Sequence, residues 1–368
     1  ENGKATEVSL KIGSQEIPIT VTSTNGAVET TTLHVLRNVD GSAYTVPTRP
    51  QYHFSQAMGW SNDPNGMLYY KGEWHLFFQY NQARTTWGEL EWGHAVSKDL
   101  IHWEELPRPL NYQEDNGAMF SGCGVVDDEN TSGLFGDEKG PGKGGLIALY
   151  TQNNELNGHR GQDQCIAYSK DNGRTWTKYK GNPILKWDED HLKDTAFRDP
   201  KVFRHDGKWF MVLAGGILRI YSSDDLIHWN IESTYKGSDD IGNPAGLRVE
   251  TECPDMYPLT ADDGTTKWVI SEGGRYYRIG DLKKIDGHWT FVQDKDSDRY
   301  VMNFGPHSYA AMTYYIGNGE TTNGKPENRR IMINWASTWA DGYCNNVDKV
   351  TGQWGYNGFF NLQTELNV

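Results

Sequence analysis

The sequence predicts an all-β fold, namely a five-bladed β-propeller that carries a short β-rich extension at its N-terminus. From Tyr52 onward helical periodicity is almost absent, and short apolar strands alternate with turns rich in Gly, Asn and Asp. Two short phrases recur along this part of the chain. They divide it into five units, each with room for four strands, and radial repetition of four-stranded sheets makes a β-propeller.

The first repeated phrase places an acidic residue close to a proline at the mouth of a hairpin. It occurs at Asp63-Pro64, at Asp199-Pro200 and, with one intervening residue, at Glu252-Cys253-Pro254. A strand, a tight polar turn and a second strand follow each copy. Hairpins that can open a unit start near five positions: Asp63, Phe120, Asp199, Glu252 and Phe304.

The second repeated phrase predicts a turn and an outer strand after each inner hairpin. Ser97–Trp103 returns as Ser223–Trp229, with a looser copy at Ser169–Trp176 and a shortened one at Asp286–Trp289. A β-sandwich with irregular hairpins is the alternative fold. It does not explain why the units open with the same phrase.

The first 46 residues form the predicted N-terminal extension, and residues 47–368 form the propeller. Apolar and polar residues alternate in the extension over three short stretches, around Val8, Ile19 and Leu33. Two prolines within Thr45–Pro50 break this pattern and mark the domain boundary. At the other end, Phe359–Leu366 is expected to supply a closing strand.

Composition narrows the class of partner. The 368 residues carry a formal net charge of −14, without a basic patch, which argues against nucleic acid and anionic membrane surfaces. No apolar run approaches the length of a membrane span. No leader with an apolar core is visible, so any signal peptide has been removed or never existed. A neutral carbohydrate fits better, because 14 Trp and 20 Tyr suit stacking on sugar rings.

Neither a metal site nor a disulfide framework is expected. The four cysteines are widely spaced and lack the Cys-x-x-Cys pairing of zinc sites: Cys123, Cys165, Cys253 and Cys344. The acidic stretch Asp294–Asp298 resembles the opening of a calcium loop but lacks its glycine and its closing glutamate.

The three acids of the first phrase are the candidate catalytic residues. The innermost strands of a propeller line one central channel, so Asp63, Asp199 and Glu252 are expected to meet at one end of it. Two facing carboxyl groups can divide glycoside hydrolysis between a nucleophile or base and a proton donor. Their separation, about 5 to 5.5 Å or roughly 6.5 to 9.5 Å, distinguishes retention from inversion.

Three segments resemble the signature motifs of glycoside hydrolase family 32, which comprises invertases, levanases, inulinases and related fructosyltransferases. They are Trp60–Gly66, Phe197–Lys201 and Glu252–Asp255. The resemblance extends over roughly residues 50 to 368. Supporting phrases are Tyr52–Phe54, Phe77–Asn81, Trp92–Ser97 and Phe120–Gly122.

This resemblance implies a secreted or cell-surface enzyme that needs no cofactor and hydrolyses β-fructofuranosides with retention. Its substrates would be levan, inulin or sucrose. Asp63 is then the nucleophile, Glu252 the general acid/base, and Asp199 the residue that stabilises the transition state. By the same resemblance, six residues are expected to line the fructose pocket: Asn62, Gln79, Trp87, Ser121, Arg198 and Trp335.

The sequence departs from the family pattern at three positions. Ser61 stands where Met is usual and is expected to widen the pocket, Cys123 stands where Ser is common, and Thr251 replaces a Trp before Glu252. The family's C-terminal β-sandwich is also absent, so the chain is either part of a longer polypeptide or functions without it.

Three alternative functions are a fructosyltransferase of the same family, a five-bladed hydrolase of arabinan or xylan, and a non-catalytic sugar-binding propeller.

Overall fold

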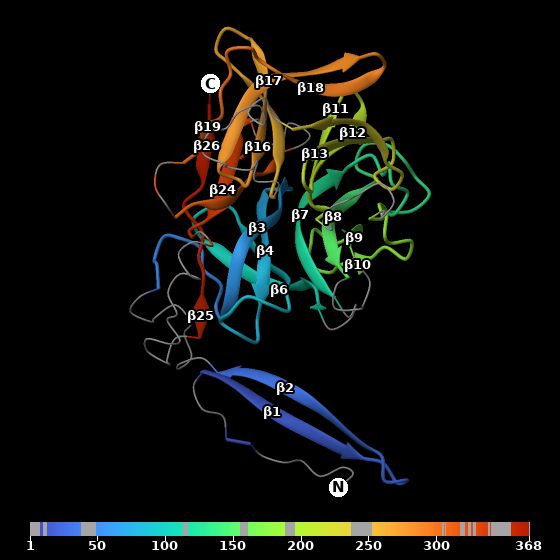
Figure 1. Cartoon of the computed structure of the whole chain (residues 1–368), viewed down its shortest axis with the longest axis vertical. Helices are drawn as coiled ribbons and strands as arrows, with labels where there is room; N and C mark the ends of the chain where they lie inside the picture. Colours follow the sequence, from blue (N-terminus) through green and yellow to red (C-terminus); the bar gives the residue numbers. More distant parts are fainter. Residues whose placement is uncertain are drawn as a thin grey trace.

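The computed structural model contains a propeller of five β-sheets and a separate N-terminal hairpin (Figure 1). The residues it describes are 8–9, 13–37, 49–112, 117–154, 161–187, 196–236, 252–303, 305, 307–316, 321–322, 325–326, 329–337, 339 and 355–367. The expected boundary near residue 46 lies outside them. So do Thr251, Phe304 and Cys344.

Each sheet runs outward from an inner strand, as predicted for propeller blades. Blade 1 is β3 (Gly59–Tyr70), β4 (Glu73–Asn81), β5 (Glu91–Ser97) and β6 (Trp103–Leu110). Blade 2 is β7 (Ala118–Asp127), β8 (Gly145–Asn153), β9 (Gln162–Ser169) and β10 (Thr177–Lys178). Blade 3 is β11 (Arg198–His205), β12 (Lys208–Ala214), β13 (Leu218–Ser223) and β14 (Asn230–Tyr235).

Blades 4 and 5 complete the circle. Blade 4 is β15 (Asp255–Thr260), β16 (Thr266–Glu272), β17 (Tyr276–Ile285) and β18 (His288–Gln293), with β19 (Tyr300–Val301) paired to β17. Blade 5 is β20 (Tyr309–Thr313), β24 (Arg330–Trp335) and β26 (Thr364–Leu366). A two-stranded ribbon is formed by β22 (Thr321–Thr322) and β23 (Lys325–Pro326). The five-bladed propeller predicted from the repeats is therefore confirmed.

Tight turns join several of the paired strands. Both turn residues have positive φ at Lys71-Gly72, Asp206-Gly207 and Asp286-Gly287. This is the geometry of two-residue hairpins whose twist matches that of the strands they connect.

The second repeated phrase forms the turn between the third and fourth strands of blades 1 to 4, as predicted. Asp99 accepts the backbone N–H groups of Ile101 and His102 at 2.9 and 2.8 Å and pairs with His102 Nδ1 at 2.7 Å. The copy at Ser223–Trp229 repeats these contacts at 3.0, 2.8 and 2.7 Å. Equal sequence thus produces equal local structure in blades far apart along the chain.

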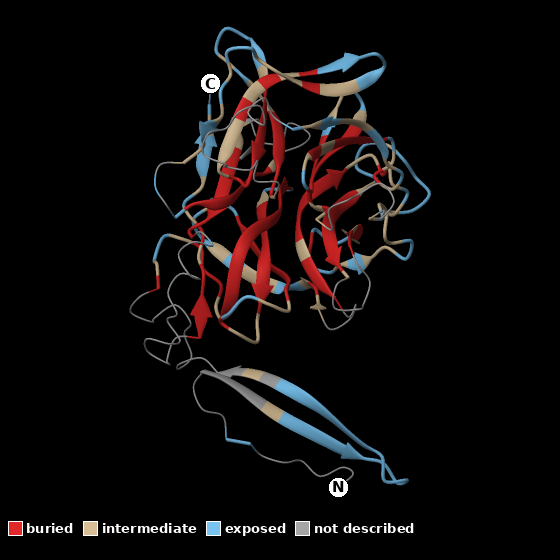
Figure 2. Ribbon diagram, in the orientation of Figure 1, coloured by how far each residue is buried: buried red, intermediate tan, exposed pale blue. Residues whose placement is uncertain are grey.

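The core lies between the blades and along the inner strands, where Figure 2 shows almost continuous burial. All 12 residues of β3 are buried. The predicted closing segment does form a strand, β26, but this strand pairs with β24 inside blade 5. Closure instead comes from β21 (Tyr315–Ile316) and β25 (Tyr356–Asn357), which both pair with β3 in parallel.

The N-terminal extension contains the hairpin β1 (Gly13–Thr22) and β2 (Val28–Arg37), paired over their whole length. Two of the three predicted strands are therefore present, and most of the first stretch lies outside the described residues. Figure 2 shows this hairpin as largely exposed. Within the described part of the chain, no helix is long and apolar enough to cross a membrane.

Candidate active site

A pocket of about 360 Å³ opens where the inner strands of the blades begin. Asp63 lies on β3, Arg198 and Asp199 open β11, and Glu252 stands just before β15. Twelve residues line the pocket: Asn62, Asp63, Gln79, Trp87, Leu90, Phe120, Ser121, Arg198, Asp199, Glu252, Cys253 and Trp339. The three acids therefore meet in one place, although 53 residues or more separate neighbours along the chain.

Irregular pairing of β3 with β4 positions Asp63. The register shifts between Ser61 and Pro64 and again between Asn65 and Leu68. Such bulges twist a strand and redirect its side chains. At Gly66, where φ is +56°, an added Cβ would meet the Phe77 ring at 2.5 Å, so only glycine fits this second shift.

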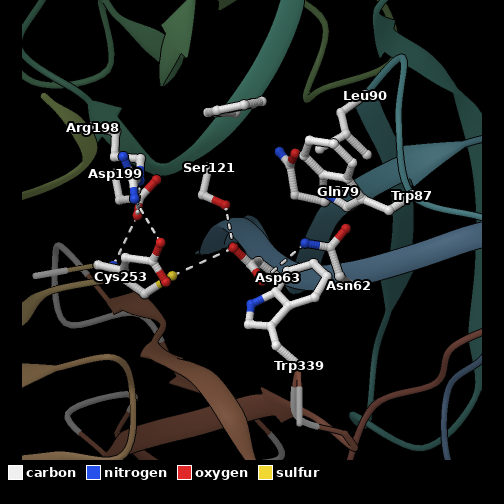
Figure 3. A pocket seen from close by; sticks show the side chains of 12 residues that line it. Asn62, Asp63, Gln79, Trp87, Leu90, Ser121, Arg198, Asp199, Cys253 and Trp339 are labelled. Carbon is white, nitrogen blue, oxygen red and sulfur yellow. Dashed lines mark hydrogen bonds and ion pairs between the residues drawn. The ribbon is translucent and has the colours of Figure 1, made fainter. Parts of the chain in front are cut away.

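Hydrogen bonds hold both carboxylate oxygens of Asp63 (Figure 3). Its Oδ2 accepts the Ser121 hydroxyl at 2.6 Å and the Cys253 thiol at 3.4 Å, and Oδ1 accepts the Asn62 amide at 3.0 Å. Burial raises the pKa of Asp63, these hydrogen bonds oppose the rise, and the nearby charge of Glu252 adds to it. The carboxylate is thus fixed in orientation and poorly hydrated, as suits a nucleophile.

Asp199 is held in an unusual backbone conformation. Its φ is +62°, which a non-glycine residue rarely adopts. Its N–H group donates to Thr151 Oγ1 at 3.0 Å, and its carboxylate accepts the Cys253 N–H at 2.9 Å. Burial raises the pKa of Asp199 to about 7, while the positive charge of Arg198 opposes this rise.

Glu252 is the most exposed of the three acids, with 36% of its side chain accessible. Arg198 Nη2 donates to Oε1 at 2.6 Å, and the Tyr309 hydroxyl donates to Oε2 at 2.5 Å. An acid/base group must exchange protons with a leaving group and with water. The exposed and doubly anchored position of Glu252 is suited to that exchange.

Aromatic side chains form the rim of the pocket. In Figure 3 Trp87 and Gln79 lie on one side of Asp63, Arg198 and Asp199 lie on the other, and Trp339 lies near Asp63. Trp87 is 45% exposed and Trp339 is 37% exposed. Such rings provide flat apolar surfaces on which a sugar ring can stack.

Trp335, the remaining expected pocket residue, is placed elsewhere. It is fully buried, and its ring packs against Trp60 at 5.8 Å and Trp339 at 5.0 Å between centroids. It does not line the pocket and instead supports Trp339, which does. The other eight expected residues all line the pocket.

The structure also corrects the expectation for Ser61. Its hydroxyl donates to Gln56 Oε1 at 2.7 Å, and its side chain lies against Gly358, away from the pocket. A side chain at this position contacts the segment around Gly358 and not the pocket, so the small size of Ser61 does not widen the pocket. Cys123 does not line the pocket either. It is buried on β7, and its sulfur accepts the Val202 N–H at 3.1 Å.

Tyr309 and Trp339 were not among the residues expected from the sequence. Tyr309 is the first residue of β20, the inner strand of blade 5. Blade 5 lacks the acid–proline phrase that marks Asp63, Asp199 and Glu252, so no repeated motif points to Tyr309. Among the described residues, no group of three or more His, Cys, Asp or Glu side chains is arranged to hold a metal ion.

Comparisons with known proteins agree with this geometry. The profile described as Glycosyl hydrolases family 32 N-terminal domain matches residues 53–367. A fructan beta-fructosidase of Streptococcus mutans is 48% identical over 335 residues, which cover 90% of this chain and 22% of that protein. A levanase of Bacillus subtilis is 42% identical over 325 residues, which cover 84% of this chain and 43% of that protein.

A solved structure gives the same assignment. The exo-inulinase of Aspergillus awamori superposes with a TM-score of 0.72 and 34% identity, covering 88% of this chain and 65% of that one. The chain spans less than half the length of the two curated relatives above. It matches the family profile over nearly all of the propeller. This protein therefore belongs to glycoside hydrolase family 32.

Proposed function

We propose that the protein hydrolyses β-fructofuranosidic linkages in fructans or sucrose with retention of configuration. The observation that supports this most strongly is the grouping of a buried carboxylate, Asp63, with a more exposed carboxyl group, Glu252, in one pocket. Similar proteins include a fructan beta-fructosidase, a levanase, an extracellular exo-inulinase and an invertase.

The proposed reaction has two displacement steps. In the first, an oxygen of Asp63 attacks the anomeric carbon of the fructosyl unit, and Glu252 gives its proton to the departing glycosidic oxygen. In the second, Glu252 takes a proton from water, and the resulting hydroxide breaks the ester and frees Asp63. The products are fructose and the leaving group of the first step, which is the shortened fructan chain or, for sucrose, glucose.

Asp199 and Arg198 have supporting roles in this proposal. The developing oxocarbenium ion carries positive charge, which the buried carboxylates stabilise in a poorly hydrated site. Asp199 accepts hydrogen bonds from fructosyl hydroxyls, and Arg198 orients Glu252 through their 2.6 Å contact. Asn62, Gln79 and Ser121 complete the fructose pocket, and Trp87 and Trp339 contact the next sugar unit.

Digestion of levan, inulin and sucrose side by side tests this function, with products separated by chain length. We expect fructose from at least one of them, and NMR of the first-formed product should show the β-anomer. A ladder of oligomers would indicate endo attack, and new oligosaccharides at high sucrose would indicate transfer. Binding without cleavage of any fructan, or release of arabinose or xylose instead, would contradict the proposal.

We also propose that the protein acts outside the cell or at its surface. Fructans are polymers too large to enter cells readily, and similar proteins carry the name extracellular exo-inulinase. Fractionation of the native host into medium, wall and cytoplasm, followed by immunoblotting, tests this location. Protein confined to the cytoplasm would contradict it.

A further inference from the structure

Three buried polar side chains of blade 2 face the segment Phe197–Asp199, which carries two pocket residues. They are Thr151 on β8 and Gln162 and Gln164 on β9. We propose that these are positioning residues that fix Arg198 and Asp199 for the reaction. This inference rests on the proposed function, because it assigns the three side chains a part in that same site.

The two glutamines form hydrogen bonds with the backbone N–H and the carbonyl of Phe197. Gln162 Oε1 accepts the Phe197 N–H at 2.9 Å, and Gln164 Nε2 donates to the Phe197 carbonyl at 2.6 Å. Phe197 lies just before β11, which begins at Arg198, and no strand pairing among the described residues includes it. Side chains of blade 2 therefore determine how the chain enters the pocket.

Thr151 continues the same network to the next residues. Its hydroxyl accepts the Asp199 N–H at 3.0 Å and donates to Gln164 Oε1 at 2.7 Å. The donor and the acceptor of each hydrogen bond in this network are thereby fixed. Asp199 has a φ of +62°, a strained conformation that persists only where the surroundings hold it. Thr151 supplies one such restraint directly at the strained residue.

Gln162 also acts on the side chain of Arg198. Its Oε1 accepts from Arg198 Nη1 at 3.3 Å, while Nη2 of the same guanidinium donates to Glu252 at 2.6 Å. The two contacts on neighbouring nitrogens limit rotation of the guanidinium plane. Arg198 Nε lies 3.9 Å from Asp199 Oδ2. Gln162 thus fixes the cation that lies between two of the three acids.

Stability alone does not explain these residue types. Thr151 and Gln164 are fully buried and Gln162 is 5% exposed. Burying a polar group costs folding free energy unless the group is hydrogen-bonded, and apolar side chains would fill the same space at a lower free-energy cost. The neighbouring positions Leu149 and Ile166 are indeed apolar. Three connected polar residues at this place are best explained by the geometry they impose on Arg198 and Asp199.

The experiment compares Thr151→Val and Gln162→Leu with the conservative variant Thr151→Ser and the control Gln152→Leu. Gln152 adjoins Thr151 on β8, and in the described part of the chain its side chain makes no hydrogen bond with Phe197–Asp199. For Thr151→Val and Gln162→Leu we expect kcat/KM on a fructan or sucrose to fall roughly 10- to 100-fold, mainly through kcat. Thr151→Ser should retain most activity, and Gln152→Leu should match the wild type.

A pH profile separates positioning from simple packing. The charge of Arg198 lowers the pKa of Asp199. If Gln162→Leu releases the guanidinium, the acidic limb of kcat/KM should move to higher pH, whereas a general loss of stability leaves that limb unchanged. Melting temperatures and the folded fraction are measured for every variant, and rates are expressed per folded molecule.

The outcomes distinguish this inference from the proposed function. Wild-type rates per folded molecule in Thr151→Val and Gln162→Leu would overturn the positioning role while leaving the function intact. Equal losses of activity in Thr151→Ser and Thr151→Val would also overturn the positioning role. Serine keeps the hydroxyl of threonine and valine does not, so equal losses would mean that this hydroxyl is irrelevant. A wild-type protein that cleaves no fructan or sucrose would instead contradict the proposed function itself.

Discussion

Replacing Asp199 by asparagine is expected to inactivate the protein and yet stabilise its fold above neutral pH. Asp199 is buried, and ionising it there costs free energy that the folded state must supply. Asparagine keeps an oxygen that can accept the Cys253 N–H bond, at present 2.9 Å long, but carries no charge. The substitution therefore removes the unfavourable charge and preserves the local geometry.

The magnitude follows from the pKa of Asp199. Burial raises it from an ordinary value of 3.8 to about 7 in the folded protein. One pKa unit corresponds to about 1.4 kcal/mol, so the ionised carboxylate costs at most about 4 kcal/mol of unfolding free energy. Loss of one group that stabilises the transition state should lower kcat roughly 100- to 1,000-fold.

The stabilisation must depend on pH in one direction. Between the unfolded pKa of 3.8 and the folded pKa of about 7, the folded state binds more protons than the unfolded state. The wild type therefore loses stability as pH rises through this window. Asparagine does not titrate, so the advantage of Asp199→Asn should be near zero below pH 3.8 and largest above pH 7.

Urea unfolding followed by tryptophan fluorescence, repeated from acid to mildly alkaline pH, measures this difference. The matched control is Asp262→Asn, which changes an exposed aspartate in the turn after β15. It should change neither stability nor activity. An advantage of Asp199→Asn that is absent at every pH, or that grows toward acid, would refute the assignment of a destabilising buried charge.

Three further predictions concern the same pocket. Asp63→Asn should abolish turnover while calorimetry still detects fructan binding, and loss of both would count against a nucleophilic role. Trp339→Ala should raise KM roughly tenfold with little loss of stability, because this ring is partly exposed at the pocket. Trp335→Ala should lower the free energy of unfolding in urea by about 3 to 5 kcal/mol, because the Trp335 ring is fully buried. The acidic limb of wild-type kcat/KM should lie above the ordinary aspartate pKa, because burial raises the pKa of both Asp63 and Asp199. A limb at or below that value would contradict this.

The sequence was sufficient to predict the propeller and the meeting of Asp63, Asp199 and Glu252. Each acid precedes a proline at the start of a repeated hairpin, directly for Asp63 and Asp199 and with one residue between for Glu252. Propeller symmetry brings such matching sequence positions close together in space. The physical basis is simple, since equivalent inner strands begin at the same end of one channel. Residues marked by the repeat were therefore the ones that could be located.

Other features depended on contacts that the repeat does not encode. Trp335 and Trp339 occur in one short phrase, and only the end of β24 at Trp335 determines which ring reaches the pocket. Tyr309 opens a blade without the phrase. Ser61 belongs to the first motif, but its hydroxyl donates to Gln56 and its side chain does not line the pocket. The motif does not encode the register shift between Ser61 and Pro64.

The proposed mechanism depends most on Asp63 as the residue that becomes bonded to fructose. Wild-type protein mixed with saturating fructan or sucrose and stopped with acid within milliseconds should carry a fructosyl ester. Digestion and mass spectrometry should locate this ester on the peptide that contains Asp63. An ester on another residue, or no ester together with an inverted first product, would contradict the mechanism.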